Sequence, residues 1–398
     1  MLEDVAVIGA SLAGLRAAEA LRESGYDGRI TAVGAETSLP YDRPPLSKQV
    51  LAGTWHPDQT TLAPVGASID DLRVDWRLGQ TATSLDLGAR RVTLADGTSL
   101  GFDGLVIATG ASVRSLAGQP VLPGIHTLRT LEDCLALKAE LDATPQRVVV
   151  VGAGFIGAEV AATVRQKGLD VTLLEALAVP LERALGPVIG AVCGEVHREQ
   201  GVDLRLSTGV AGFAGSDRVE GVVLSDGTTI EADVVVVGVG VAPNTGWLEG
   251  SGLNIDNGVV CDESCLAAPG VVAAGDVARW PNRRFGEVMR VEHWDNAQEQ
   301  GAHAARRLLH GDGEHAEAYV PVPWFWSDQY DRKLQLAGRS GPDDEVVIVD
   351  GSLEERRFVA LYGRAGRLVG VLGFNRPALV MRYRQQIADG MAWADAIA

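Results

Sequence analysis

Residues 148–157 read VVVVGAGFIG, an apolar run followed by glycines at Gly152, Gly154 and Gly157. In such a turn the first glycine makes the tight bend and the second lets the backbone approach a pyrophosphate. The third lets the next helix pack on the strand. The phosphate then lies at the helix N-terminus, where amide N–H groups and the helix dipole favour an anion. The stretch therefore predicts a strand–turn–helix unit that binds a dinucleotide, with Ile156 among the contacts.

Glu175 indicates which coenzyme this turn binds. It stands 23 residues after Gly152, at the end of the following apolar strand. A carboxylate at that place accepts a hydrogen bond from a ribose 2′-OH, whereas an NADP site more often carries an arginine. We therefore predict that the turn binds NADH.

A second copy of the pattern, VAVIGASLAG, occupies residues 5–14. It keeps Gly9 and Gly14, but Ser11 stands where the later copy has its middle glycine. Serine is small enough to permit the approach of a phosphate, and its hydroxyl is able to donate to one. The acid is displaced too, because glycine ends the next strand and the nearest carboxylate is Glu36. The copy predicts a second dinucleotide site with Glu36 as the candidate ribose ligand.

The duplication extends beyond the turns. Each copy is followed by an apolar hairpin with an Asp-Gly turn and then by an apolar strand that ends in glycine, at residues 91–110 and 219–240. The repeated plan predicts two doubly wound α/β domains. After VPVPWFW, at residues 320–326, the pattern changes to strands and a final helix, which predicts a smaller α+β domain.

Composition excludes several classes of protein. A chain of 398 residues predicts two or three domains, and a net charge of −17 argues against nucleic-acid binding. No apolar run approaches the roughly 20 residues that span a bilayer, and the N-terminal MLEDVAVIGA lacks the positive charge of a signal peptide. The small number of cysteines, four, fits a reducing compartment, so we expect a cytoplasmic protein. From the charge and the apolar runs we expect it to bind no nucleic acid and no membrane.

The cysteines also argue against thiol chemistry. Flavin reductases of disulfides carry a reactive cysteine pair early in the first domain, but residues 1–133 contain no cysteine. Cys261 and Cys265, in CDESC, do not have the spacing of a redox pair. We expect them to be structural, with a metal or redox role as the alternative, and we assign no metal site.

Four motifs in order resemble those of one flavoprotein family. They are the doubled glycine turns, LPYDRPPLSKQVLAG at residues 39–53, VVAAGDVA at 271–278 and PWFWSDQY at 323–330. Nearly the whole chain resembles the ferredoxin reductases of the putidaredoxin, rubredoxin and aromatic-dioxygenase type, which are related to apoptosis-inducing factor. The resemblance implies FAD on the first turn, NADH on the second, and a C-terminal interface domain.

The resemblance also implies a domain plan and a set of contacts. The FAD domain would comprise residues 1–112 and 242–318, the NAD domain 113–241, and the interface domain 319–398. Where relatives place an acid for the FAD ribose this chain has Ala35, so Glu36 or water must serve. The implied FAD contacts are Gly9, Ser11, Ala13, Gly14, Glu36, Arg43, Lys48, Thr109, Gly110, Arg129, Gly275, Asp276 and Trp294, the last through its backbone. The implied NAD contacts are Gly152, Gly154, Ile156, Gly157, Glu175 and Arg183.

The activity that the resemblance implies is electron transfer from NADH through FAD to a small 2Fe–2S ferredoxin that serves an oxygenase. Glu159 would orient the nicotinamide and pair with Lys48, and Trp326 would approach the flavin rim. Two alternatives remain open: an NADH oxidase that uses oxygen or a quinone, and a flavoprotein whose redox state controls partner binding.

Charge is unevenly distributed along the chain. Residues 1–278 hold 19 Lys and Arg against 35 Asp and Glu, whereas residues 279–398 hold 16 against 17. The nearly neutral part therefore offers a basic rim for an acidic ferredoxin. The candidates for this rim are Arg283, Arg284, Arg306, Arg307, Lys333 and Arg382.

Overall fold

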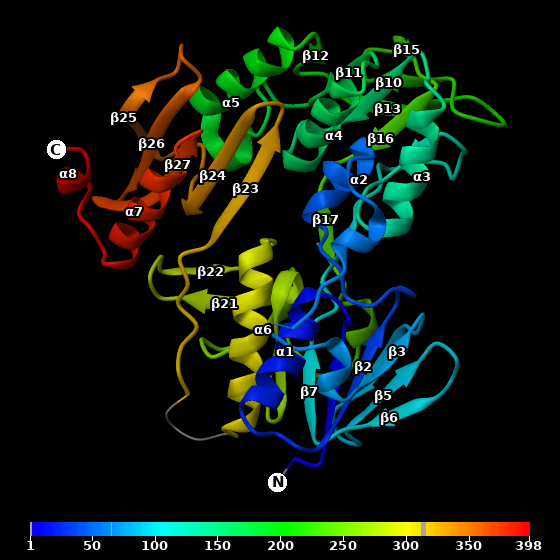
Figure 1. The fold of residues 1–398 in the computed structure, drawn as a ribbon, viewed down its shortest axis with the longest axis vertical. Coiled ribbons are helices and arrows are strands. Elements are labelled where there is room, and N and C mark those ends of the chain that lie inside the picture. Colours follow the sequence, from blue (N-terminus) through cyan, green and yellow to red (C-terminus); the bar gives the residue numbers. More distant parts are fainter. Residues whose placement is uncertain (1, 65, 312–315) are drawn as a thin grey trace. The chain divides into compact units, whose positions relative to one another are not determined.

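The computed structural model describes residues 2–64, 66–311 and 316–398 and shows a mixed α/β fold (Figure 1). The chain forms two compact units. The first consists of Met1–Asp42, Thr60–Ser112 and Ala242–Pro323, and the second of Arg43–Gln59, Val113–Val241 and Trp324–Ala398. Among the described residues, no helix combines the length and the apolar character needed to cross a bilayer.

The first unit is built on a six-stranded sheet. Its strands, in sheet order, are β19 (Leu266–Ala268), β20 (Val271–Ala273), β7 (Gly104–Ile107), β1 (Asp4–Ile8), β2 (Arg29–Gly34) and β3 (Val74–Leu78). β19 and β20 are antiparallel, and all other neighbouring strands are parallel. Parallel neighbours require a crossover connection between them, such as α1 (Leu12–Glu23) between β1 and β2. The apolar run VAVI is β1 at the centre of this sheet, which agrees with its burial.

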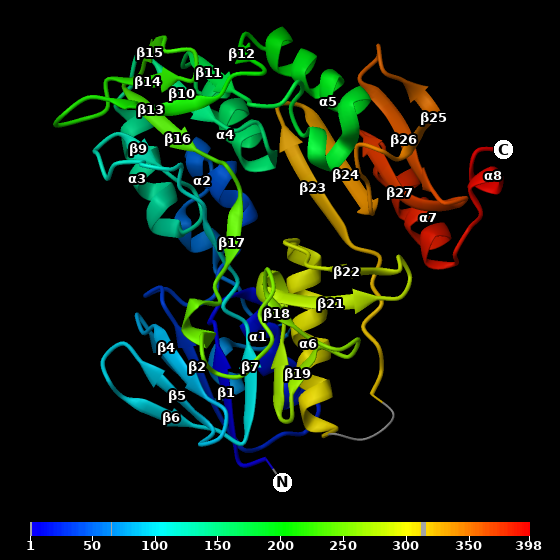
Figure 2. The same cartoon turned by 180° about the vertical axis from the view of Figure 1, so that it is seen from behind.

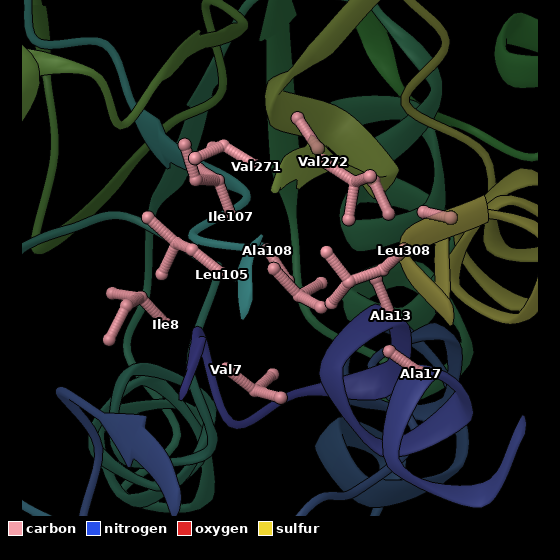
Figure 3. Close-up of a cluster of buried hydrophobic side chains, with 14 of the residues drawn as sticks. Val7, Ile8, Ala13, Ala17, Leu105, Ile107, Ala108, Val271, Val272 and Leu308 are labelled. Carbon is pink, nitrogen blue, oxygen red and sulfur yellow. The ribbon is translucent and has the colours of Figure 1, made fainter. Parts of the chain in front are cut away.

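Helices α1 (Leu12–Glu23) and α6 (Trp294–Leu309) pack closely on each other in this unit. A Cβ on Gly301 would lie 2.4 Å from the carbonyl oxygen of Ala13, so only glycine permits the approach. Figure 3 shows the core that the helices share with the strands, with Ala13, Ala17 and Leu308 beside Val7 and Val272.

The two Asp-Gly hairpins have the same local structure. One lies in the sheet of β4 (Ala82–Asp86), β5 (Arg91–Leu94) and β6 (Ser99–Gly101), and the other in that of β13 (Val210–Ala214), β14 (Gly221–Leu224) and β15 (Thr229–Glu231). Asp96 accepts from the Thr98 amide at 2.9 Å and hydroxyl at 2.7 Å, and Asp226 accepts from Thr228 at the same two distances. The duplicated plan is therefore confirmed down to the turns.

The second unit contains a parallel sheet around the second glycine turn. Its strands, in order, are β12 (Asp203–Arg205), β11 (Val171–Leu174), β10 (Val148–Val151), β16 (Val234–Val237) and β9 (Ile125–His126). Its helices are α3 (Leu131–Asp142), α4 (Phe155–Gln166) and α5 (Glu182–Glu199). Residues 43–59, which include α2 (Gln49–Ala52), pack on α3 and α4.

The chain ends in an antiparallel sheet within the second unit. In order its strands are β23 (Trp324–Gln329), β24 (Arg332–Gly338), β27 (Arg367–Phe374), β26 (Arg357–Arg364) and β25 (Glu345–Ser352), followed by α7 (Pro377–Ala388) and α8 (Trp393–Ala396). Both views show α5 beside this sheet (Figures 1 and 2). Apolar residues of α5, such as Leu185 and Ile189, share a core with Phe358 and Tyr362.

Smaller pieces complete the chain. β8 (Ala111–Val113) pairs with β17 (Val241–Pro243), and β18 (Val259–Val260), β21 (Ala278–Asn282) and β22 (Glu287–Met289) form a three-stranded sheet.

Candidate functional site

In the first glycine turn, two glycines are required by the protein's own packing. Gly9 has φ +120°, and a Cβ there would lie 2.0 Å from the carbonyl oxygen of Ala108. A Cβ on Gly14 would lie 2.0 Å from the carbonyl oxygen of Gly9, so α1 would have to move off β1. Ser11 has an extended backbone and immediately precedes α1. The first and third positions are therefore set by the close packing of helix, turn and strand.

The second turn repeats this geometry but differs at its middle position. A Cβ on Gly157 would lie 1.9 Å from the Gly152 carbonyl oxygen, and one on Gly152 would lie 2.5 Å from that of Gly238. A Cβ on Gly154 would meet no described atom within 4 Å, and its φ of −74° is open to any residue. Nothing in the fold requires glycine there, so the open space fits the approach of a pyrophosphate to the N-terminus of α4.

The carboxylate of Glu175 lies beside the second turn. Its two oxygens accept hydrogen bonds from the amides of Ala153 at 2.8 Å and Leu177 at 2.9 Å. These bonds orient the half-buried carboxylate at the end of β11, and each oxygen keeps a lone pair for a further donor. This is the chemistry that a ribose hydroxyl requires.

The first unit lacks a carboxylate at the corresponding place. Gly9 donates its amide to Val33, as Gly152 does to Leu174, so Gly34 corresponds to Glu175. A Cβ on Gly34 would lie 2.7 Å from that of Ala10, which leaves little room for a side chain. Glu36 is half-buried and accepts a hydrogen bond from the Tyr41 hydroxyl.

Gly275 and Asp276 form a turn beside α1. Gly275 has φ +75°, and a Cβ there would lie 3.0 Å from that of Ala13. Its amide donates to Gln300 Oε1 at 2.9 Å, and the Asp276 carbonyl accepts from Arg290 Nη1 at 2.9 Å. Gln300 is completely buried on α6. The sequence gives no sign of this role, because a glutamine inside a helix is not recognisable as a ligand without its partner.

Trp294 begins α6. Its indole Nε1 donates to Asp42 Oδ1 at 2.7 Å. Burial raises the pKa of Asp42, and the indole hydrogen bond opposes that rise. The indole is held by Asp42, while the backbone amide lies in the first turn of a long helix, where a carbonyl or anion is favoured. This agrees with a backbone role for Trp294, which stays a prediction.

Asn244 is a second polar residue that we missed. Its side-chain Nδ2 donates to the Thr109 carbonyl at 2.8 Å, and its backbone carbonyl accepts from the Thr109 hydroxyl at 2.9 Å. Ser112 donates to Asn244 Oδ1 at 2.7 Å. Thr109 and Gly110 are thereby fixed where β7 ends. The asparagine after the apolar strand of the second copy, in VAPN, was the available signal.

The second unit brings Lys48 and Glu159 together. Glu159, on α4, is 3% exposed, and its Oε2 accepts from Lys48 Nζ at 2.7 Å. Ser47 Oγ donates to the same oxygen at 2.5 Å, and Ser327 Oγ donates to Oε1 at 2.7 Å. The pairing expected from the sequence is present, and the two serines are additional. Together they satisfy a buried carboxylate whose charge Lys48 balances.

Trp326 lies two residues after Trp324 on β23. Their rings stack with centroids 5.3 Å apart and planes at 28°. Alternate residues of a strand face opposite sides, so Ser327 reaches Glu159 from the other face. β23 thus carries the tryptophan pair on one face and a ligand of the Lys48–Glu159 pair on the other.

Three further predicted residues also belong to the second unit. Arg43 Nη1 donates to the carbonyl of Arg129 at 2.6 Å, and the Arg129 amide donates to Asp133 at 2.9 Å. Arg183 is exposed in the first turn of α5. Their roles toward FAD and NAD remain predictions.

One of the six candidates for the basic rim is wrong. Arg307 is 7% exposed, and its guanidinium donates to Ser264 Oγ at 2.8 Å and to the Gly311 carbonyl. It is among the buried residues of α6, so its guanidinium is not accessible to a partner protein. Arg283, Arg306, Lys333 and Arg382 are exposed and Arg284 is half-buried.

All four cysteines are free and buried, which agrees with a structural role. Burial raises the pKa values of Cys134, Cys193 and Cys261 to about 12, and that of Cys265 well above its ordinary value. Because the thiolate is the reactive form, these thiols are poor nucleophiles and poor redox partners.

Comparison with known proteins gives the family. Residues 3–301 match the pyridine nucleotide-disulphide oxidoreductase model, and residues 324–398 match the reductase C-terminal model. Rhodocoxin reductase of Rhodococcus erythropolis is 42% identical over 97% of this chain and 90% of its own length. Putidaredoxin reductase of Pseudomonas putida is 38% identical over 97% and 92%.

Two solved structures have the same fold over almost the whole chain. The covalent putidaredoxin reductase–putidaredoxin complex gives a TM-score of 0.90 at 35% identity and covers 98% of this chain and 94% of that one. The ferredoxin reductase for the CYP199A2 system of Rhodopseudomonas palustris gives 0.91 at 38%, covering 98% and 96%. The chain belongs to the pyridine nucleotide-disulphide oxidoreductase family and carries the reductase C-terminal domain.

Proposed function

We propose that this protein is an NADH-dependent, FAD-containing ferredoxin reductase, which passes electrons to a small 2Fe–2S ferredoxin of an oxygenase system. The duplicated glycine turn, one copy in each unit, carries the proposal because it supplies two dinucleotide sites. The relatives support the acceptor. They include putidaredoxin reductase and the ferredoxin–NAD(+) reductase component of the anthranilate 1,2-dioxygenase system of Burkholderia cepacia, which is 39% identical.

FAD is assigned to the first turn and NADH to the second. Bound FAD supplies the exchange between a two-electron donor and a one-electron acceptor. On the first turn Gly9, Ser11 and Gly14 would hold the pyrophosphate at the start of α1, with Ala13 beside the Gly275 turn. On the second, Glu175 would bind the ribose 2′-OH and repel the 2′-phosphate of NADP.

The Lys48–Glu159 pair is assigned to the nicotinamide and flavin. We propose that Glu159 orients the nicotinamide and that Lys48 balances the negative charge of a reduced flavin. Because Ser47 and Ser327 also donate to the carboxylate, the pair is held in one geometry before coenzyme binds. We assign Trp326 to the route by which electrons leave.

The acceptor would dock on exposed or half-buried basic side chains. With Arg307 removed, the candidates are Arg283, Arg284, Arg306, Lys333 and Arg382. A ferredoxin of opposite charge would be steered by such side chains mainly in its association rate. We also propose that the protein is cytoplasmic, since four free thiols suit a reducing compartment.

The activity is tested by NADH-driven reduction of cytochrome c with and without added ferredoxin. We expect rapid reduction only when ferredoxin is present, and a rate that falls as salt screens the charges. Equal NADH consumption without ferredoxin, with oxygen or a quinone as acceptor, would instead show an oxidase. Slow transfer to every acceptor would favour a flavoprotein that acts through partner binding. In that assay, Arg306→Glu should raise the KM for ferredoxin, while reduction of a small dye stays unchanged.

A further inference from the structure

Helix α5 is interrupted close to its start. Gly186 has φ +77° and ψ 172°, outside the helical region, and Pro187 follows it. Proline lacks an amide hydrogen and clashes with the preceding turn, so the break separates residues 181–185 from the rest of α5. Carbonyl groups just before the break lose helical partners and need others.

Strand β26 of the antiparallel C-terminal sheet and the loop that follows β24 supply these partners. Ser340 Oγ donates to the carbonyl of Ala184, and the Tyr362 hydroxyl donates to the carbonyl of Leu185 at 3.0 Å. Tyr362 is fully buried in the core that α5 shares with the sheet. Both donors serve backbone groups, so they fix the position of the segment and not a particular side chain.

The other end of the same segment is bonded to the second glycine turn. Leu181 has a left-handed backbone, φ 56°, and its amide donates to the carbonyl of Ala153 at 3.1 Å. Ala153 lies between Gly152 and Gly154, and its own amide donates to Glu175. Residues 181–185 therefore connect the turn to the C-terminal part of the chain. At the turn the hydrogen bond joins two backbone groups, and at the other end side-chain hydroxyls donate to backbone carbonyls.

Arg183 lies in the middle of this connection and is exposed. We infer that Ser340 and Tyr362 are positioning residues for NADH: by holding residues 181–185 they set the place of Arg183 and of the second glycine turn. This inference rests on the proposed function, because it takes the second turn to be the NADH site. It makes the C-terminal sheet, far along the chain from the turn, a determinant of coenzyme affinity.

The test compares hydroxyl deletions in the FAD-loaded protein. Tyr362→Phe and Ser340→Ala should each raise the Kd for NADH by about two- to tenfold, while the limiting rate of flavin reduction and the FAD content stay near wild type. Ser340→Thr, which keeps a hydroxyl, should restore the affinity. Tyr383→Phe, a hydroxyl deletion on α7 of the same domain, is the matched control and should bind NADH as wild type. The Kd and the limiting rate are read from the NADH dependence of flavin bleaching.

A double-mutant cycle shows whether the effect passes through Arg183. Adding Tyr362→Phe to Arg183→Ala should cost much less affinity than adding it to wild type. Wild-type Kd values in both deletion variants would overturn the inference and leave the proposed function intact. If Tyr362→Phe does not fold, Ser340→Ala, at a partly exposed site, decides alone. A wild-type protein that NADH does not bleach would overturn the proposed function itself.

Discussion

The two glycine turns share their backbone geometry and differ at two positions. In both, the first and third glycines approach carbonyl oxygens so closely that a Cβ would collide with them. The middle position, Ser11 in one turn and Gly154 in the other, has no such constraint in the second turn among the described residues. The comparison separates the glycines that the fold requires from the position that is left to the ligand.

The acid position differs in the same way. Glu175 bonds to the amides of Ala153 and Leu177 and so becomes part of its turn, whereas Gly34 lies too close to Ala10 to carry a side chain. Each turn therefore presents its own ligand-binding groups on the same backbone, which the first and third glycines define and which we call the frame. Exchanging residues between the two turns should change coenzyme binding and leave the frame intact.

Breaking the frame should have the largest effect. Gly14→Ala and Gly157→Ala each place a Cβ within about 2 Å of a backbone oxygen, so a helix must move. We expect either change to lower the free energy of unfolding by about 3 kcal/mol or more, measured by urea denaturation. Gly154→Ala is the control and should be within about 0.5 kcal/mol of wild type. Equal losses in Gly154→Ala and Gly157→Ala would contradict the distinction between the positions.

Acid should lower the free energy of unfolding through His197, a buried residue of the second unit. His197 is buried on α5, its Nδ1 lies 2.9 Å from the Tyr330 hydroxyl, and burial lowers its pKa to about 4 from the ordinary 6.5. Between pH 6.5 and 4 the unfolded chain binds a proton that the folded chain does not, so stability falls as the pH falls. We expect this effect to lower the free energy of unfolding at pH 4 by about 3 kcal/mol.

The check is the pH dependence of urea denaturation in wild type and His197→Gln. Because other groups titrate equally in both proteins, the difference between the two curves isolates His197. The variant should show a smaller loss of stability from pH 6.5 to pH 4. Parallel curves over that range would show that folding does not lower the pKa of His197.

Gly154→Ser gives the second turn the middle residue of the first. The side chain enters the open space at the start of α4, so folding should be unchanged. The first turn admits a phosphate beside Ser11, but a phosphate that lies against the bare backbone of Gly154 would be crowded by the added side chain. We expect the Kd for NADH to rise about tenfold, equal to about 1.4 kcal/mol, with FAD content as in wild type. An unchanged Kd would mean that the pyrophosphate does not approach this position.

Glu175→Gln tests the difference between the acid positions of the two turns with almost no change in the shape of the side chain. It removes the charge and keeps a side-chain oxygen for one backbone amide. The preference for NADH over NADPH, as a ratio of kcat/KM values, should narrow by about tenfold or less, because the 2′-phosphate is no longer repelled. A ratio equal to that of wild type would show that the charge of Glu175 does not select the coenzyme.

Local patterns predicted much of this structure. Spacing alone predicted the turns, their helices and the twin hairpins. The pairing of Lys48 with Glu159 was implied by the family resemblance. What the sequence could not show depends on tertiary contacts. Ser327 reaches Glu159 across 168 residues, and Gln300 supports Gly275 from inside α6. Arg307 looks like a surface cation until the packing of α6 buries it.

The most direct test of the account is to mix the FAD-loaded protein with NADH or NADPH without oxygen and then to add ferredoxin. The account predicts a yellow protein that NADH bleaches far faster than NADPH, and whose colour returns when oxidised ferredoxin is added. Equal bleaching by the two coenzymes would contradict the assignment of the second turn. Bleached protein whose colour did not return with ferredoxin would contradict the proposed electron transfer.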